Sequence, residues 1–153
     1  MSFCRGCWRN LPRRKTRKPT AQEVAAIRNC ATKYHDDVDE GERQCVFNLV
    51  ATPCTNTREG SSNIGTADCY RVEWVIWDNL LNENFKNLMG ALDSQQTAKL
   101  RARCSKPGSP TATRPAIFSM DKIQGSTAIP MGAACAARET ARRALLLRFF
   151  DQI

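Results

Sequence analysis

Apolar residues recur every three or four positions between Thr66 and Leu92, and this spacing predicts one long amphipathic helix. Its apolar stripe consists of Val72, Ile76, Leu80, Leu81, Phe85, Leu88, Met89 and Leu92. The polar side chains of the segment are mostly expected to face the other way: Glu73, Asp78, Glu83, Asn84, Lys86 and Asn87. Asp93 and Ser94 then predict a turn and the N-cap of a returning helix.

Two further helices are predicted on either side of this segment. Residues 20–23 read Thr-Ala-Gln-Glu, a capping box, and a helix is expected to start there with Val24, Ile27 and Ala31 on one face. The last helix is predicted from about Pro130 to Phe149, because a proline in the first turn removes no helical hydrogen bond. Residues 36–42 are predicted to be a solvated connection, and residues 53–65 a loop. Residues 42–50 are predicted to form either a short helix or an extended piece.

The predicted fold class is therefore all-α. We expect a small antiparallel helical bundle or hairpin supported by disulfides, with an irregular loop that interrupts the second helix of the main unit. In that loop, residues 104–120, three prolines and a glycine prevent a continuous helix. The chain has 153 residues, enough for one domain with a core, and contains no apolar run long enough to span a membrane.

Charge is unevenly distributed along a chain whose net charge is +8. Residues 1–20 contain seven basic side chains and no acidic one, whereas residues 21–100 contain seven basic and twelve acidic side chains. A basic stretch such as residues 5–18 can bind nucleic acid through its phosphates, but a disordered, solvated tail is the favoured interpretation. The acidic region 21–100 favours a cationic partner.

Eight cysteines suit disulfides in an oxidising compartment. Cys45 and Cys54 bracket a predicted loop, so a local disulfide between them is one candidate pairing. Cys69 and Cys135 lie near the starts of the long and last helices. The long helix and the last helix are the first and third helices of an up-down-up unit, so they run parallel and their N-terminal ends lie on the same side. Cys69 and Cys135 are therefore a second candidate pair. Cys30 is left for Cys104, Cys4 or Cys7, or remains unpaired.

A set of residues in the two longest predicted helices, and just before the second of them, carries a family resemblance: Cys69, Glu73, Trp77, Asp78, Leu81, Asn82, Phe85, Leu88, Gly125, Ser126, Ala134, Cys135, Thr140, Ala141, Arg142 and Arg143. In this order and spacing, which extends over roughly half of the chain, it resembles the LprI-type lysozyme-inhibitor family of small cysteine-containing helical envelope proteins. The resemblance implies a periplasmic or secreted binding protein that blocks a lysozyme, a cationic glycosidase, by masking its cleft. It does not mark the inhibitory contact residues.

The resembled family has a regular helix where residues 104–120 are irregular. The neighbouring reading frame of this segment can encode a Trp-x-x-Tyr-Arg-Asp helix, so we interpret the segment as a compensated frameshift that opens near Cys104 and closes near Asp121. Residues 1–19 are interpreted as a basic, disordered arm or a misread signal peptide, since the chain as written has no signal peptide. Residues 20–153 are expected to form a single domain.

The sequence contains few residues or motifs that could carry catalysis or hold a cofactor. His35 is the only histidine, and no segment supplies a nucleophile with an orienting group or a phosphate-binding glycine loop. The Cys4-x-x-Cys7 pair lacks two further ligands for zinc. We therefore predict a protein-binding protein with no catalytic residues, metal, cofactor or small-molecule substrate. The alternatives are an envelope scaffold of the same fold and a nucleic-acid-binding protein that uses residues 5–18.

Overall fold

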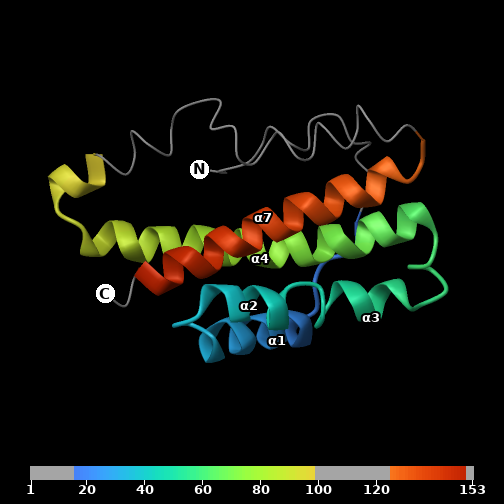
Figure 1. Ribbon diagram of the computed structural model, residues 1–153, viewed down its shortest axis with the longest axis horizontal. Helices are drawn as coiled ribbons and strands as arrows, with labels where there is room; N and C mark the ends of the chain where they lie inside the picture. Colours follow the sequence, from blue (N-terminus) through green and yellow to red (C-terminus); the bar gives the residue numbers. More distant parts are fainter. Residues whose placement is uncertain (1–15, 99–124, 151–153) are drawn as a thin grey trace.

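The computed structural model describes residues 16–98 and 125–150, and every regular element in these residues is a helix. The elements in chain order are α1 (Ala21–Lys33), α2 (Val38–Cys45), α3 (Ala51–Thr55), α4 (Asn63–Ala91) and α7 (Ala128–Phe150) (Figure 1). The predicted all-α class is confirmed. Over the same residues, none of the helices combines the length and the apolar character needed to cross a membrane.

The longest helices, α4 and α7, lie side by side and run parallel (Figure 1). Three hydrogen bonds give the register: Asn63 Nδ2 donates to Ser126 Oγ (2.9 Å), Trp74 Nε1 donates to Thr140 Oγ1 (3.1 Å), and Asn84 Nδ2 donates to the Ala144 carbonyl oxygen (2.9 Å). Helix α7 contributes small, fully buried side chains to its packing: Ala133, Ala137, Ala141 and Ala144. Small side chains at a helix contact allow the axes to approach closely. The expected parallel arrangement of these helices is confirmed.

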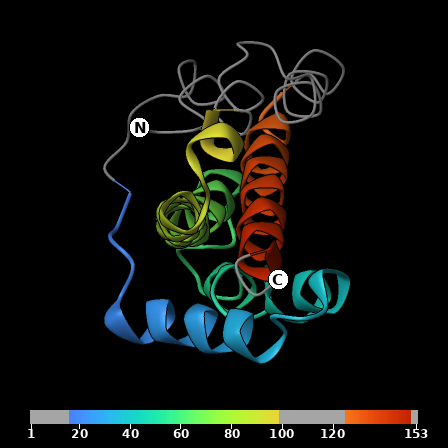
Figure 2. The same cartoon turned by 90° about the vertical axis from the view of Figure 1, so that its left-hand side faces the viewer.

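Helices α1, α2 and α3 all lie on one side of the α4–α7 pair (Figures 1 and 2). The core forms where these layers meet, around the fully buried Trp77 of α4 and Ile27 of α1. Its other members are Ala31, Cys45, Val46, Val50, Val72, Ile76, Leu80, Leu81, Ala141, Ala144 and Leu145. Half of the predicted apolar stripe of the long helix, Val72, Ile76, Leu80 and Leu81, therefore meets Ile27 and Ala31 of the first helix in one core.

Two predicted connections contain helices, and those parts of the prediction are wrong. Helix α2 occupies most of 36–42 because Asp37 caps it, accepting a hydrogen bond from the Glu40 amide at 2.9 Å. The buried Gly41 places the helix against Leu145, which lies 3.3 Å from the position that a β-carbon would take. Helix α3 lies partly in 53–65, and α4 starts at Asn63 because the Ser62 hydroxyl accepts from the Gly65 amide at 3.0 Å.

Several predictions fall partly or wholly outside the described residues. The turn after α4 is confirmed, since Asp93 accepts a hydrogen bond from the Gln96 amide at 2.7 Å and residues 94–98 are helical. Of the returning, antiparallel helix only this beginning is described. The basic arm 1–19 is described only at residues 16–19, and the insert 104–120, with its proposed frameshift, lies outside.

Two disulfides fasten the first three helices to their neighbours. Cys30–Cys45 joins α1 to the end of α2, and Cys54–Cys69 joins α3 to α4, with Cα–Cα distances of 5.8 and 5.7 Å. The candidate pairings of Cys45 with Cys54 and of Cys69 with Cys135 are therefore wrong. Helices α2 and α3 carry Cys45 and Cys54 to other partners. Cys135 is free and half-buried. It lies two residues from the buried Ala133 and Ala137, about 200° round α7, and so faces away from α4.

The start of α1 has the predicted capping box. The Glu23 amide donates to Thr20 Oγ1 (3.2 Å), and the Thr20 amide donates to Glu23 Oε2 (2.8 Å). Arg17 also holds this carboxylate, with Nη1 2.8 Å from Oε2 and Nη2 2.5 Å from Oε1. Hydrogen bonding from Arg17, and then from Thr20, lowers the pKa of Glu23 from 4.5 to about 2, against the opposing effect of burial.

The lowered pKa of Glu23 predicts a specific loss of stability in acid. Its folded pKa lies below its unfolded value, so the contribution is present above pH 4.5 and is lost as the pH falls toward 2. We expect a loss of about 1–2 kcal/mol, because the cap and a partly exposed ion pair are each worth about 1 kcal/mol. Urea unfolding at pH 5 and pH 2.5 should show a larger difference for the wild type than for Glu23→Gln. Equal differences would contradict the assignment.

Candidate functional site

The α4 carboxylate of Glu73 organises the loop between α2 and α3. It is fully buried, although the sequence pattern predicted that it faces away from the apolar stripe. Its Oε1 accepts hydrogen bonds from the Phe47 amide (2.7 Å) and from Trp77 Nε1 (3.1 Å). Its Oε2 accepts from the Ala51 amide (2.9 Å). One side chain therefore fixes both ends of the turn at residues 47–51 and orients the central tryptophan.

Burial raises the pKa of Glu73, while the hydrogen bonds from Phe47, Ala51 and Trp77 act in the opposite direction. A buried carboxylate is costly unless its oxygens are satisfied. Here three donors hydrogen-bond to the carboxylate oxygens. The carboxylate in turn accepts from two backbone amides that have no partner within a helix.

Phe47 adopts a conformation that a bulky side chain rarely takes. Its φ is 69°, in the left-handed region, which costs about 1–2 kcal/mol for a residue with a β-carbon. The bond from its amide to Glu73 and a second bond, from the Thr52 amide to its carbonyl oxygen (2.8 Å), hold it there. Its ring packs edge-on against Tyr70 with the centroids 5.0 Å apart, and the Arg138 guanidinium lies 5.3 Å from the ring centre.

An open groove of about 530 Å³ lies between α2, this turn and α7. We call it the Phe47 groove; it is lined by Asp39, Glu42, Arg43, Val46, Phe47, Asn48, Thr52 and Arg138. Glu42 lies 2.9 Å from Arg142 Nη1 and 3.7 Å from Arg138 Nε. Asp39 is held more loosely, 3.4 Å from Arg142, with its side chain 76% exposed. The α2 rim thus presents carboxylates whose present partners are solvent-exposed arginines of α7.

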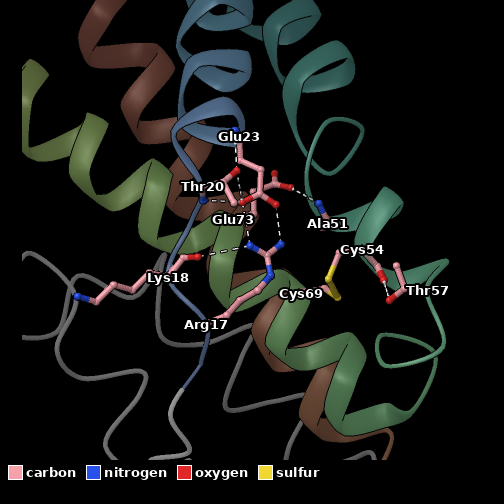
Figure 3. Close-up of polar contacts among 9 residues, drawn as sticks. All are labelled: Arg17, Lys18, Thr20, Glu23, Ala51, Cys54, Thr57, Cys69 and Glu73. Atoms are coloured by element: carbon pink, nitrogen blue, oxygen red, sulfur yellow. Dashed lines mark hydrogen bonds and ion pairs between the residues drawn. A yellow bond between two sulfur atoms is a disulfide. The ribbon is translucent and has the colours of Figure 1, made fainter.

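A second groove, of about 460 Å³, lies along the Cys54–Cys69 disulfide (Figure 3). We call it the disulfide groove; it is lined by Arg17, Cys54, Thr57, Glu59, Gly60, Gly65, Asp68, Cys69 and Val72. Figure 3 shows the Arg17 side chain beside the disulfide, with its guanidinium bound to Glu23. Thr57 Oγ1 closes the adjoining turn by donating to the Cys54 carbonyl oxygen at 2.7 Å.

The resembled motif residues fall into a buried set and a partly exposed set. Glu73, Trp77 and Leu81 follow one another at intervals of four along the buried side of α4, and Thr140 is buried opposite them on α7. The half-buried residues are Asp78, Asn82, Phe85 and Arg143. Asn82 Nδ2 donates to the Asp78 carbonyl oxygen (2.7 Å), and burial raises the pKa of the Asp78 carboxyl. The structure therefore brings Glu73, Trp77 and Thr140 into the interior and leaves the Asp78–Asn82 pair at its edge.

Sequence reasoning missed Phe47, Asp39, Glu42 and Arg138 as lining residues. Their grouping depends on the left-handed turn at Phe47, which no local pattern indicates. One available signal was the position of Glu73, four residues before Trp77 and eight before Leu81, which places it on a buried row of the helix.

Residues 16–98 and 125–150 contain no group of three or more His, Cys, Asp or Glu side chains that could hold a metal ion. Comparison of the chain with protein-family models, with curated proteins and with solved structures finds no match to any of them.

Proposed function

We propose that this protein is an envelope binding protein of the lysozyme-inhibitor type, which binds and blocks a cationic lysozyme. The proposal starts from the resemblance in α4 and α7. Its structural support is one arrangement: Glu73, a residue of the resembled motif, builds the turn that forms the floor of the Phe47 groove. The two disulfides suit an oxidising compartment such as the periplasm or the cell exterior.

The Phe47 groove is the proposed contact surface because of the chemistry of its α2 rim. The Asp39 and Glu42 carboxylates, whose side chains are 76% and 20% exposed, are paired with arginines of α7 that are more than half exposed. Ion pairs with such an exposed partner are worth about 0–1 kcal/mol. A lysine or arginine of a basic partner can replace the α7 arginines at little cost. Such contacts contribute to both the association rate and the specificity of charged complexes.

Titration calorimetry of the oxidised protein with a cationic lysozyme at low salt tests this function, together with the rate of cell-wall lysis. We expect saturable binding, slower lysis, and an affinity that falls as salt is added. The double variant Asp39→Asn/Glu42→Gln is expected to bind about tenfold more weakly, a loss of about 1.4 kcal/mol.

Glu59→Gln is the control and is compared with the single variant Asp39→Asn, because each removes one exposed acidic charge but Glu59 lines the disulfide groove and not the Phe47 groove. We expect Glu59→Gln to bind as tightly as the wild type. No binding at low salt would overturn the proposed function. Equal weakening by Glu59→Gln would show that overall charge, and not the Phe47 groove, governs the association. Capture of other periplasmic proteins without lysozyme would favour the scaffold alternative.

A further inference from the structure

The two disulfides have the same sequence separation, 15 residues, but different surroundings. Each bond joins a half-buried cysteine, Cys30 or Cys54, to a buried one, Cys45 or Cys69, so the difference lies in what surrounds them. Cys45 belongs to the main core, and Cys30 packs against that core. Cys54 and Cys69 lie outside this core cluster, and both line the disulfide groove. Of the two grooves described above, neither is lined by Cys30 or Cys45.

We propose that Cys54–Cys69 is a thiol–disulfide exchange site that takes a small thiol or dithiol through the disulfide groove, whereas Cys30–Cys45, which packs in and against the main core, is a structural bond that reacts more slowly. The inference is independent of the proposed lysozyme partner. A groove of about 460 Å³ has room for a small dithiol. Direct attack on a disulfide requires that the incoming thiolate reach a sulfur atom, so access determines which bond reacts first.

Cys54 is the sulfur that we expect to be attacked, since it is half-buried while Cys69 is only 2% exposed. The thiolate of the dithiol forms a bond to Cys54 Sγ, the Cys54–Cys69 bond breaks, and Cys69 leaves as a thiolate that takes up a proton. The second thiol of the dithiol then attacks the dithiol's first sulfur in the mixed disulfide, and Cys54 leaves as a thiolate that takes up a proton. The dithiol is oxidised to a disulfide, and the protein gains two thiols.

Charge along the groove bears on this reaction because the attacking group is an anion. Glu59 is exposed on the rim, and Asp68 is paired with Arg71 at 2.6 Å. Arg17 supplies a positive charge on the other side, but Glu23 is bonded to its guanidinium. The exposed carboxylate of Glu59 therefore slows the approach of a thiolate, and reversing its charge should speed it.

The test is native-state reduction of the oxidised full chain by dithiothreitol, quenched by alkylation and mapped by peptide mass spectrometry. We expect Cys54 and Cys69 to become alkylated at least about tenfold faster than Cys30 and Cys45, because the core bond reacts only after the structure opens. Between 0 and about 1 M urea, the Cys54–Cys69 rate should stay constant while the Cys30–Cys45 rate rises. Equal rates, or rates that rise together with urea, would overturn the proposal.

Glu59→Lys and Asp36→Lys supply a matched pair of charge reversals. Only Glu59 lines the disulfide groove, whereas Asp36 is exposed in the turn between α1 and α2. At low salt we expect Glu59→Lys to raise the Cys54–Cys69 rate by about two- to fivefold and Asp36→Lys to leave it unchanged. An unchanged rate in Glu59→Lys would show that the thiolate does not enter through this groove.

Discussion

Replacing Glu73 by alanine is expected to lower the free energy of unfolding by about 3–5 kcal/mol. The change leaves three buried donors without their acceptor: the Phe47 amide, the Ala51 amide and Trp77 Nε1. It also removes the bond that holds Phe47 at positive φ. Urea unfolding followed by circular dichroism measures the loss directly, and the extra space left by the side chain adds to it.

The variant Glu73→Gln separates the role of the Glu73 carboxylate from that of its volume, and Glu83→Gln is the control. Glu73→Gln keeps the size and one accepting oxygen but turns an amide group toward an N–H donor, so we expect an intermediate loss of about 1–3 kcal/mol. Glu83→Gln removes a carboxylate from the same helix, where the side chain is 45% exposed and paired with Arg28. That loss should stay below about 1 kcal/mol. A Glu73→Ala protein no less stable than Glu83→Gln would contradict the role assigned to Glu73.

The double variant Cys30→Ala/Cys45→Ala is expected to cost about 3–4 kcal/mol. In the chain-entropy account, closing a loop of 15 residues contributes about 3 kcal/mol, and the loss of Cys45 packing in the core adds to it. Thermal or urea unfolding of the oxidised proteins provides the measurement. For a domain of typical stability, such a loss is a large fraction of the total.

Cys135→Ala is the control for the disulfide variant, since Cys135 is free and half-buried. It also removes a thiol group, but it opens no loop, and we expect a change within about 1 kcal/mol. If Cys135→Ala were as damaging as the double variant, the effect would come from lost packing and not from the covalent bond.

Local patterns in the sequence were sufficient to predict the helices that bury a wide apolar face. Helix α4 follows from the spacing of Val72, Ile76 and Leu80, and the start of α1 follows from Thr20 and Glu23, because these signals depend only on neighbours along the chain. Helix α3 was missed because it has no such local signal. Helix α3 has five residues and no side-chain cap, so tertiary contacts, including the bond from Ala51 to Glu73, hold it in place.

The candidate site depends on contacts that are distant in sequence. Glu73 is 26 residues from Phe47, and a polar residue on a helix is expected to face solvent unless its partners are known. The cysteine pairs were mispredicted because spacing alone does not determine connectivity, and helices α2 and α3 bring Cys45 and Cys54 to other partners. The resemblance pointed to Glu73 and Trp77 without indicating what either residue does.

Within the described residues, each bonded cysteine has the next one along the chain as its partner: Cys30 with Cys45, then Cys54 with Cys69. A chain that leaves the ribosome at about 5–20 residues per second exposes each partner within about 1–3 s of the first cysteine. If oxidation keeps pace with emergence, each of these two bonds can form as soon as its second cysteine appears, before the later cysteines of the described residues are present. A fully reduced chain that refolds after synthesis lacks this ordering in time and must select its pairs from all the cysteines present.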